Sequence, residues 1–287
     1  MNYRTFFSLL VTFALMGALF WAIPPAKIII EFHAVSWPLF GGGILIFFPM
    51  IWLAAIRWRF LVKQHARMTK KEALHVTLVG CSLNAIAPSK TGDLVKAHDL
   101  YRRNKSIRKG VIAVLWEKYY DFSALFGFTA AGMLAIMPEL HLLAYALLAA
   151  IAIMTTLFFF MKWFAAFRPS GKEFALLMAL TAGNWGIQFV QIILFFHAFG
   201  AALPPATIII RTATAIFVGL VPVTLAGMGT RDLALQYLFH AYLPATKIAA
   251  LGLLLSFRYW FPALLGLPAA FQYFCAPQEN AILSKNK

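Results

Sequence analysis

The sequence predicts an all-α polytopic membrane protein in which six full transmembrane spans and two re-entrant helical hairpins form an inverted repeat. Of its 287 residues, 62% are hydrophobic and only 12% are charged, whereas a soluble domain carries about 25% charged residues. Loops rich in lysine and arginine alternate with loops that have few, as expected of a chain that crosses a membrane repeatedly. Two apolar runs are interrupted by proline, glycine and charged residues, and these interruptions predict the hairpins.

The formal net charge of +15 does not indicate a nucleic-acid partner, because the basic residues lie in short loops between apolar runs. This placement follows the positive-inside rule and predicts which loops are cytoplasmic. The two cysteines, Cys81 and Cys275, have neither the spacing of a zinc site nor that of a disulfide framework. We therefore expect membrane lipid head groups and not nucleic acid beside these basic loops, no cofactor, and no metal at the cysteines.

The first span is predicted at Phe6–Ile23, long enough at 1.5 Å per residue to cross a hydrocarbon core of about 30 Å with little tilt. No small-residue cleavage motif follows it, so we expect an uncleaved span and not a signal peptide. The loop Pro24–Ser36 holds one lysine against one glutamate and is expected outside. The second span, Trp37–Ile56, returns to the cytoplasmic side. Six basic residues follow it: Arg57, Arg59, Lys63, Arg67, Lys70 and Lys71.

The next apolar run, Ala73–Ala87, has only about 15 residues and basic residues on both sides. If it crossed the membrane, one of these basic flanks would lie outside. We therefore predict a hairpin over residues 73–93 that enters from the cytoplasm, turns at Pro88–Gly92 and returns, with its irregular backbone buried in protein. The alternative is a full crossing that departs from the positive-inside rule.

The rest of the chain repeats this order. Further spans are predicted at Gly110–Met137, Leu142–Met161, Phe174–Phe199 and Ile248–Phe271, with the interrupted run Ala206–Tyr242 before the last. Residues 1–138 and 139–275 thus form two units, the second with an external hairpin over residues 206–243. Because each unit makes three crossings, the second is inverted relative to the first. Both termini, including the tail 276–287, are then expected on the cytoplasmic side of the plasma (inner) membrane.

A short sequence match links the two predicted hairpins. Thr91-Gly92-Asp93-Leu94 in the first corresponds to Thr230-Arg231-Asp232-Leu233 in the second, and each follows a proline and a run of small residues. In transporters built from inverted repeats, paired interruptions of this kind mark the substrate site.

Glu117 and Asp121 lie four residues apart near the start of the third span and therefore share a helix face. An ionisable residue inside a span costs about 2.5–3.5 kcal/mol on insertion scales and usually lines a cavity. Three uses remain open for this pair. The two carboxylates could bind a divalent metal, pair with Lys90, Lys96 or Arg258, or lie at the interface where water reaches them.

Three cations are candidates for binding a phosphate, since planar guanidinium groups and lysine side chains both recognise it. If the tips of the hairpins meet, Lys90, Arg231 and Arg258 could surround a lipid phosphate. Gly227 and Gly229 would then allow the backbone to approach closely. The alternative is that these cations pair with Asp93, Asp232 and Glu117 and hold the hairpins shut. A basic amphipathic helix, predicted at Leu94–Lys109, would attract anionic head groups on the inner leaflet.

These segments resemble the flippase-like membrane family typified by the transmembrane region of lysylphosphatidylglycerol synthase. Its N-x3-P-x-x-x-G-E-x-x-R element resembles Asn84, Pro88, Gly92, Asp93 and Lys96. Its E-R-x-x-D element resembles Glu117 and Asp121, and its late P-x-x-G-G-x-G-x-x-E element resembles Pro222, Gly227, Gly229 and Asp232. The chain departs from the family pattern where aspartate stands for glutamate and lysine for arginine. A lysine lacks the bidentate fork of an arginine, which changes how a phosphate would be held.

The resemblance implies a flippase or scramblase-like transporter that moves an anionic or aminoacylated phospholipid, or a polyprenyl-phosphate-linked lipid, between leaflets. The chain has no soluble aminoacyl-transferring domain, so we expect it not to be an enzyme. Two other functions remain open: a membrane enzyme acting on a lipid phosphate, such as a prenyl or glycosyl transferase, and a non-catalytic partner subunit of a lipid-modifying enzyme. A homo-oligomer is also compatible with the sequence.

Overall fold

The computed structural model describes residues 3–86, 92–220, 224 and 227–275, and within these residues every regular element is a helix. The first half contains α1 (Tyr3–Ala22), α2 (Pro25–His33), α3 (Trp37–Leu45), α4 (Phe47–Val62), α5 (Lys70–Ile86), α6 (Leu94–Asn104) and α7 (Ile107–Ile136). The second half contains η2 (Pro138–Leu140), α8 (His141–Phe160), η3 (Lys162–Phe167), α9 (Gly171–Ala198), α10 (Pro205–Val218), α11 (Thr230–Phe239) and α12 (Ala245–Cys275).

The prediction of a polytopic helical membrane protein is confirmed. Four stretches are long and apolar enough to cross a membrane, and they coincide with the second, fourth, fifth and sixth predicted spans: Trp37–Val62, Pro138–Phe160, Gly171–Ala198 and Ala245–Cys275. A fifth candidate is the pair Leu10–Ala22 and Pro25–His33, which is bent by 76°. The third predicted span corresponds to α7, which is 30 residues long but has charged residues in its first half and is not among the four.

Two predicted boundaries are wrong. The expected loop Pro24–Ser36 contains α2, because Pro25 occupies the first turn, where its missing N–H has no helical partner to lose. The expected helix Leu94–Lys109 ends at Asn104, and Lys105 takes a left-handed conformation with φ 57°. The Ser106 hydroxyl then accepts a hydrogen bond from the backbone N–H of Lys109 and begins α7. Local capping thus divides one basic segment between two helices.

Among the described residues, the two halves share some helix lengths, although α2 has no counterpart in the second half and α9 stands alone where the first half has α3 and α4. The 20-residue α1 corresponds to the 20-residue α8, and the 30-residue α7 corresponds to the 31-residue α12. Between them, α5 is followed by α6 across one break, and α10 is followed by α11 across the other. The two interrupted segments of the sequence lie at these breaks.

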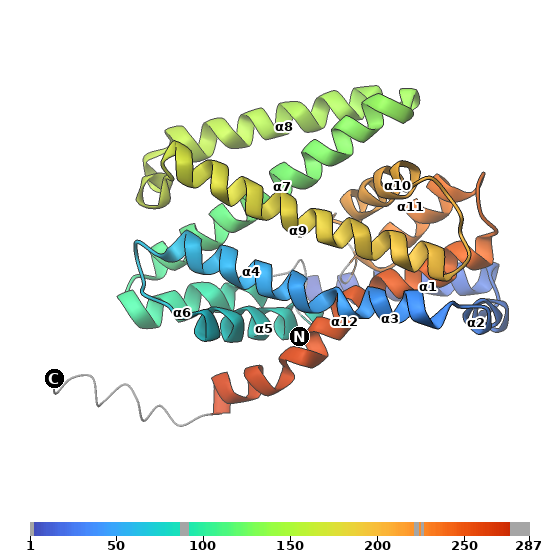
Figure 1. Ribbon diagram of the computed structural model, residues 1–287, viewed down its shortest axis with the longest axis horizontal. Helices are drawn as coiled ribbons and strands as arrows, with labels where there is room; N and C mark the ends of the chain where they lie inside the picture. Colours follow the sequence, from blue (N-terminus) through green and yellow to red (C-terminus); the bar gives the residue numbers. More distant parts are fainter. Residues whose placement is uncertain (1–2, 87–91, 221–223, 225–226, 276–287) are drawn as a thin grey trace.

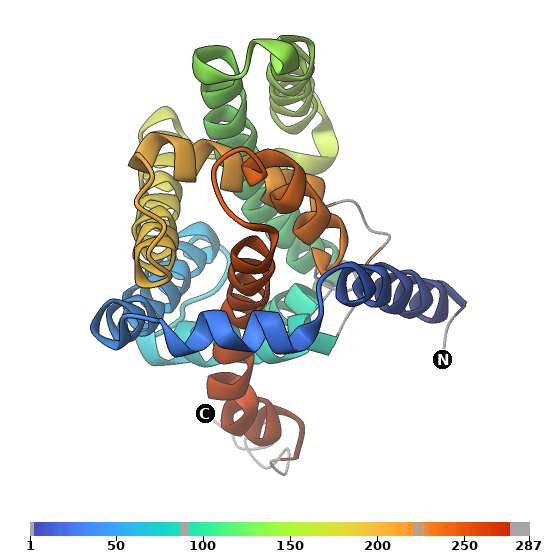
Figure 2. The ribbon, with the colours of Figure 1, turned by 90° about the vertical axis from the view of Figure 1, so that its right-hand side faces the viewer.

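Helix α12 packs against α5, and in Figure 2 its first part lies among the other helices while its C-terminal end projects below them. In the most apolar 18-residue stretch of α12, 61% is buried within the protein, compared with 11% in that of Pro138–Phe160, which contains α8. Close packing of α12 on α5 depends on Gly266, where a Cβ atom would overlap the Leu78 carbonyl oxygen and the Ser82 hydroxyl. Ser82 donates a hydrogen bond to the Ala263 carbonyl at 2.7 Å and connects the same two helices.

The other helices lie around the first part of α12 (Figure 2). Helices α7 and α8 form a hairpin whose far ends project beyond the other helices in Figures 1 and 2. Helix α1 lies at one side of the bundle (Figure 2). The buried side chains form two apolar cores, one around α9, α10 and α12 and the other around α4, α5, α6 and the first half of α7. The charged residues of α7 lie at the second core.

Candidate functional site

Six charged side chains gather where α4, the start of α6 and the first half of α7 meet, and we refer to them as the six-charge cluster. Its members are Arg57, Asp93, Lys96, Glu117, Lys118 and Asp121. Three are cations and three are carboxylates, so the cluster is electrically neutral when all six are ionised. Most of these groups are buried, and a buried charge requires a partner of opposite sign.

Glu117 is the most buried carboxylate of the cluster, with 2% of its side chain exposed. It accepts hydrogen bonds from the Lys96 ammonium at 2.8 and 2.9 Å and from the Arg57 guanidinium at 3.3 Å. Arg57 also donates to both oxygens of Asp121, at 2.5 and 3.1 Å, in the bidentate geometry that guanidinium and carboxylate favour. A further bond from Arg57 to the Thr181 hydroxyl, at 3.1 Å, connects the cluster to α9.

Asp93 connects the first broken helix pair to α7. Its carboxylate accepts hydrogen bonds from Lys118 and from the Asn84 amide, the latter at 3.0 Å, and its distance to the Lys96 ammonium is 3.7 Å. Asn84 lies at the end of α5, so Asp93 ties both sides of the break together. Gly92 packs against Leu83 and the backbone nitrogen of Asn84, where no Cβ atom would fit.

Of the three uses that the sequence left open for Glu117 and Asp121, the structure shows ion pairing. Both carboxylates are engaged by Arg57, and Lys96 is the predicted partner that pairs with Glu117. No group of three histidine, cysteine, aspartate or glutamate side chains within the described ranges could hold a metal ion. Sequence reasoning missed Arg57, because it counted this residue as a loop charge although it lies in the last turns of α4.

A second charged cluster joins the start of α11 to α12. Arg231 donates to Asp232 at 2.7 and 3.1 Å, to the Gly252 carbonyl at 2.9 Å and to the Ser256 hydroxyl at 2.7 Å. Asp232 also accepts from the backbone N–H of Gly229 at 3.0 Å and thereby caps α11. Only 1% of Arg231 is exposed. This pair matches the pairing of Arg231 with Asp232 in the alternative interpretation, and its further bonds tie α11 to α12.

Gly227 and Gly229 have φ angles of 75° and 94°, which glycine adopts at little cost. A Cβ atom on Gly227 would lie 2.8 Å from the Gly219 carbonyl oxygen, and one on Gly229 would lie 2.8 Å from the Leu15 Cβ atom. These glycines therefore let the backbone pack closely against Gly219 and Leu15, whereas the sequence predicted a close approach to a lipid phosphate.

Arg258 is half-buried, and its environment differs from that of the buried Arg57 and Arg231, which both pair with carboxylates. Its guanidinium donates to the side-chain oxygens of Gln191 and Gln188 on α9, each at 2.9 Å. No carboxylate among the residues of the structure forms a salt bridge with it. Because Arg258 follows Ser256 by two residues, it lies about 200° around α12 from the side chain that bonds Arg231. Arg231 and Arg258 therefore contact different neighbours of α12.

The structure thus brings together one group of the predicted site residues at the first break, a second group at the next break, and Arg258 by itself on α12. The first group is Asn84, Gly92, Asp93, Lys96, Glu117 and Asp121. The second group is Gly227, Gly229, Arg231 and Asp232. Lys90, like Pro88 and Pro222, lies outside the described residues. That these side chains bind a lipid head group stays a prediction.

The fold and these clusters define a class of protein: a polytopic helical membrane protein whose buried charges gather where its helices break. The sequence matches the family described as the lysylphosphatidylglycerol synthase TM region over residues 5–171 and 160–266. The chain belongs to this family, and the resemblance drawn from its motifs is confirmed. A comparison with curated proteins gives no match.

Proposed function

We propose that this protein is a lipid flippase or scramblase-like transporter in the plasma (inner) membrane. Its substrate would be an anionic or aminoacylated phospholipid, or a polyprenyl-phosphate-linked lipid. The chain would move this lipid between leaflets without modifying it. Membership of a lipid-related membrane family supports the proposal, and the observation that carries it is the environment of Arg258.

Arg258 lies about 20 Å from the start of α12, and thus near the middle of a helix that is long enough to span the membrane. A cation at this depth is costly and marks a pathway or a ligand site. The two glutamine oxygens are neutral dipoles, so they solvate the guanidinium without cancelling its charge. A lipid phosphate that passes through the protein would supply the missing negative charge and match the planar fork of the guanidinium.

The two broken helix pairs supply the architecture for this pathway. In our proposal α5 and α6 form a re-entrant hairpin open to the cytoplasm, and α10 and α11 form one open to the exterior. Residues 1–138 and 139–275 are then inverted repeats whose hairpins meet near the bilayer middle. The six-charge cluster and the Arg231–Asp232 pair hold the hairpins in place, and the acyl chains stay in lipid.

The proposal predicts that Arg258→Gln slows leaflet exchange. In proteoliposomes that contain fluorescent phosphatidylglycerol, we expect the exchange rate to fall by about tenfold or more, because one charge-assisted contact to the phosphate is lost. The variant leaves no charge unpaired but removes hydrogen bonds to Gln188 and Gln191, so we expect a loss of stability of about 1–3 kcal/mol at most. Exchange is measured at a temperature where the variant stays folded. Dithionite quenching of outer-leaflet fluorescence measures the rate.

Arg211→Gln is the matched control, because Arg211 is also an arginine of the second half but bonds the Leu238 carbonyl and the Tyr242 hydroxyl. Exchange by this variant should match that of the wild type. Wild-type rates for Arg258→Gln, or no exchange by the wild-type protein with any lipid of an anionic and zwitterionic panel, would contradict the proposal. Partner-dependent or metal-dependent turnover of a lipid phosphate would instead favour a partner subunit or an enzyme.

A further inference from the structure

A cavity of about 450 Å³ lies between the end of α4 and the start of α5, apart from both charged clusters. Its volume is within the range of small-molecule sites in proteins. Arg59, Lys63 and Arg67 supply three cationic side chains to its lining, and Glu72 supplies the one acidic side chain. The lining therefore carries a net positive charge.

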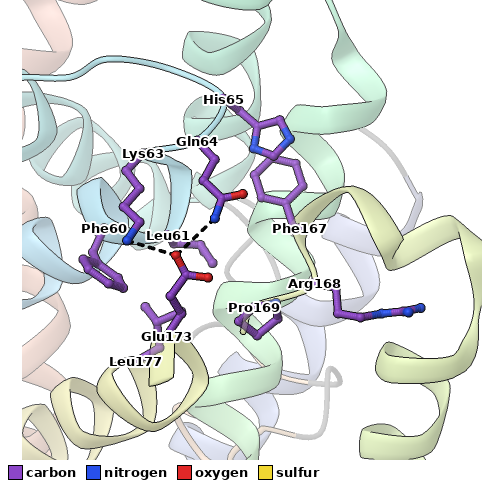
Figure 3. A pocket seen from close by; sticks show the side chains of 10 residues that line it. All are labelled: Phe60, Leu61, Lys63, Gln64, His65, Phe167, Arg168, Pro169, Glu173 and Leu177. Atoms are coloured by element: carbon purple, nitrogen blue, oxygen red, sulfur yellow. Dashed lines mark hydrogen bonds and ion pairs between the residues drawn. The ribbon is translucent and has the colours of Figure 1, made fainter. Parts of the chain in front are cut away.

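The acidic groups near this cavity are already occupied. Glu72 accepts from the backbone N–H of Thr69 at 2.6 Å and from Arg103 at 3.0 Å. The hydrogen bond from Thr69 holds the pKa of Glu72 below its ordinary value, so this carboxylate is ionised at neutral pH. Glu173 is occupied as well: Figure 3 shows Lys63 and Gln64 pointing toward it, with Lys63 Nζ and Gln64 Nε2 lying 3.0 and 3.1 Å from Glu173 Oε1.

The two guanidinium groups of the cavity lining, those of Arg59 and Arg67, form no salt bridge with a carboxylate of the described residues. Arg59 donates from Nε to the Met68 carbonyl at 2.6 Å, which fixes the side chain and leaves its terminal nitrogens for another acceptor. Arg67 forms no side-chain ion pair with a described residue, and both arginines are exposed. Their planar forks suit an oxyanion with several acceptor oxygens.

The position of Arg59 on α4 indicates where this anion comes from. Phe48 and Trp52 are 53% and 43% exposed. Trp52 follows Phe48 by four residues and Arg59 follows Trp52 by seven, so all three share one face of α4. This face is exposed along a candidate span, and Arg59 lies near the basic end of that span, where we expect the lipid head groups. Arg57, two residues earlier, points in the opposite direction into the six-charge cluster.

We propose that this cavity binds the phosphate of an anionic membrane lipid, held by Arg59 and Arg67 at the basic end of α4. A soluble phosphate ester has the same chemistry, but the exposed apolar face of α4 favours a head group that arrives from the bilayer. The site is independent of the transport pathway proposed at Arg258, because binding can be measured without leaflet exchange. Failure of one proposal therefore leaves the other standing.

Native mass spectrometry of the full chain in detergent, with phosphatidylglycerol and phosphatidylcholine as probes, tests this site. The wild type should bind phosphatidylglycerol more tightly than phosphatidylcholine. Arg59→Gln/Arg67→Gln should weaken binding of the first phosphatidylglycerol by about tenfold or more, since two charge-assisted contacts are lost. Arg67→Glu alone, at a side chain with no ion pair to lose, should weaken it in the same direction.

The matched control is Lys70→Gln/Lys71→Gln, which removes the same charge from exposed residues beside the cavity that do not line it. This variant should bind phosphatidylglycerol within about twofold of the wild type, because Lys70 and Lys71 do not line the cavity and water and salt screen the charge of exposed side chains. Equal loss in the two double variants, or no loss in either, overturns the proposal. Displacement of phosphatidylglycerol by an equal concentration of inorganic phosphate would overturn the assignment to a lipid.

Discussion

Arg57 and Arg59 are two residues apart in α4 but lie in opposite environments. Arg57 is buried among Glu117, Asp121 and Thr181, whereas Arg59 is exposed near the basic end of that helix. Two residues correspond to about 200° of helical rotation, so Arg57 points into the protein while Arg59 points to its surface. The positive-inside rule counts both equally and therefore cannot tell a structural ion pair from a surface charge.

At the residue scale, we expect Glu117→Gln to destabilise the protein strongly. The substitution leaves the Arg57 and Lys96 cations facing a neutral amide in a buried site. Removing one partner of a buried pair costs about 3–5 kcal/mol. Thermal unfolding of detergent-purified protein, followed by circular dichroism, measures the loss.

Glu139→Gln serves as the control for this prediction, because Glu139 is exposed in η2 and forms no salt bridge with a described residue. It should unfold at the wild-type temperature. If Glu117→Gln also unfolds at the wild-type temperature, the cluster does not hold α4, α6 and α7 together, and the ion-pair interpretation is wrong.

At the element scale, helix contacts in this protein depend on glycines that face a neighbouring helix. Gly110 packs against the Ala97 backbone between α6 and α7, and Gly132 packs against the Ile210 side chain between α7 and α10. Small residues at such positions let helix backbones approach closely in a membrane, where van der Waals packing drives association. Helix propensity would favour alanine at these positions, so the contact and not the helix accounts for glycine.

Gly266→Ala is expected to separate α12 from α5, because the added methyl group would overlap the Leu78 carbonyl and the Ser82 hydroxyl. Overpacking of this kind costs about 1–3 kcal/mol. We expect a lower unfolding temperature and loss of the Ser82 hydrogen bond to Ala263. Gly127→Ala in α7, where a Cβ atom meets no other atom, should raise stability by up to about 1 kcal/mol. A Gly266→Ala protein at least as stable as Gly127→Ala would contradict this packing.

At the scale of the whole molecule, the proposed inverted repeat determines which loops face the cytoplasm. In a background without Cys81 and Cys275, single cysteines at Gln64 and Lys172 should be labelled by a membrane-impermeant maleimide only after the membrane is opened. Single cysteines at Glu139 and Ala202 should be labelled in intact cells, because their loops have few basic residues. All four positions are on the protein's surface. Labelling of all four from one side would show that the two halves are not inverted.

The sequence by itself determined that this is a polytopic helical membrane protein, and it located four of the candidate spans. Both results depend on local properties, namely the length of apolar runs and the charge of the loops. The short motifs around Asp93, Glu117 and Asp232 determined its family. Only the tertiary structure decided the partners of these residues: Lys118 for Asp93, Arg57 for Glu117, and glutamines for Arg258. The physical reason is that an ion pair requires two groups within a few ångströms, and the residues that meet here come from helices far apart in the chain. A helix boundary or a span can be predicted from neighbouring residues, but the charge balance of a buried site depends on how the helices pack.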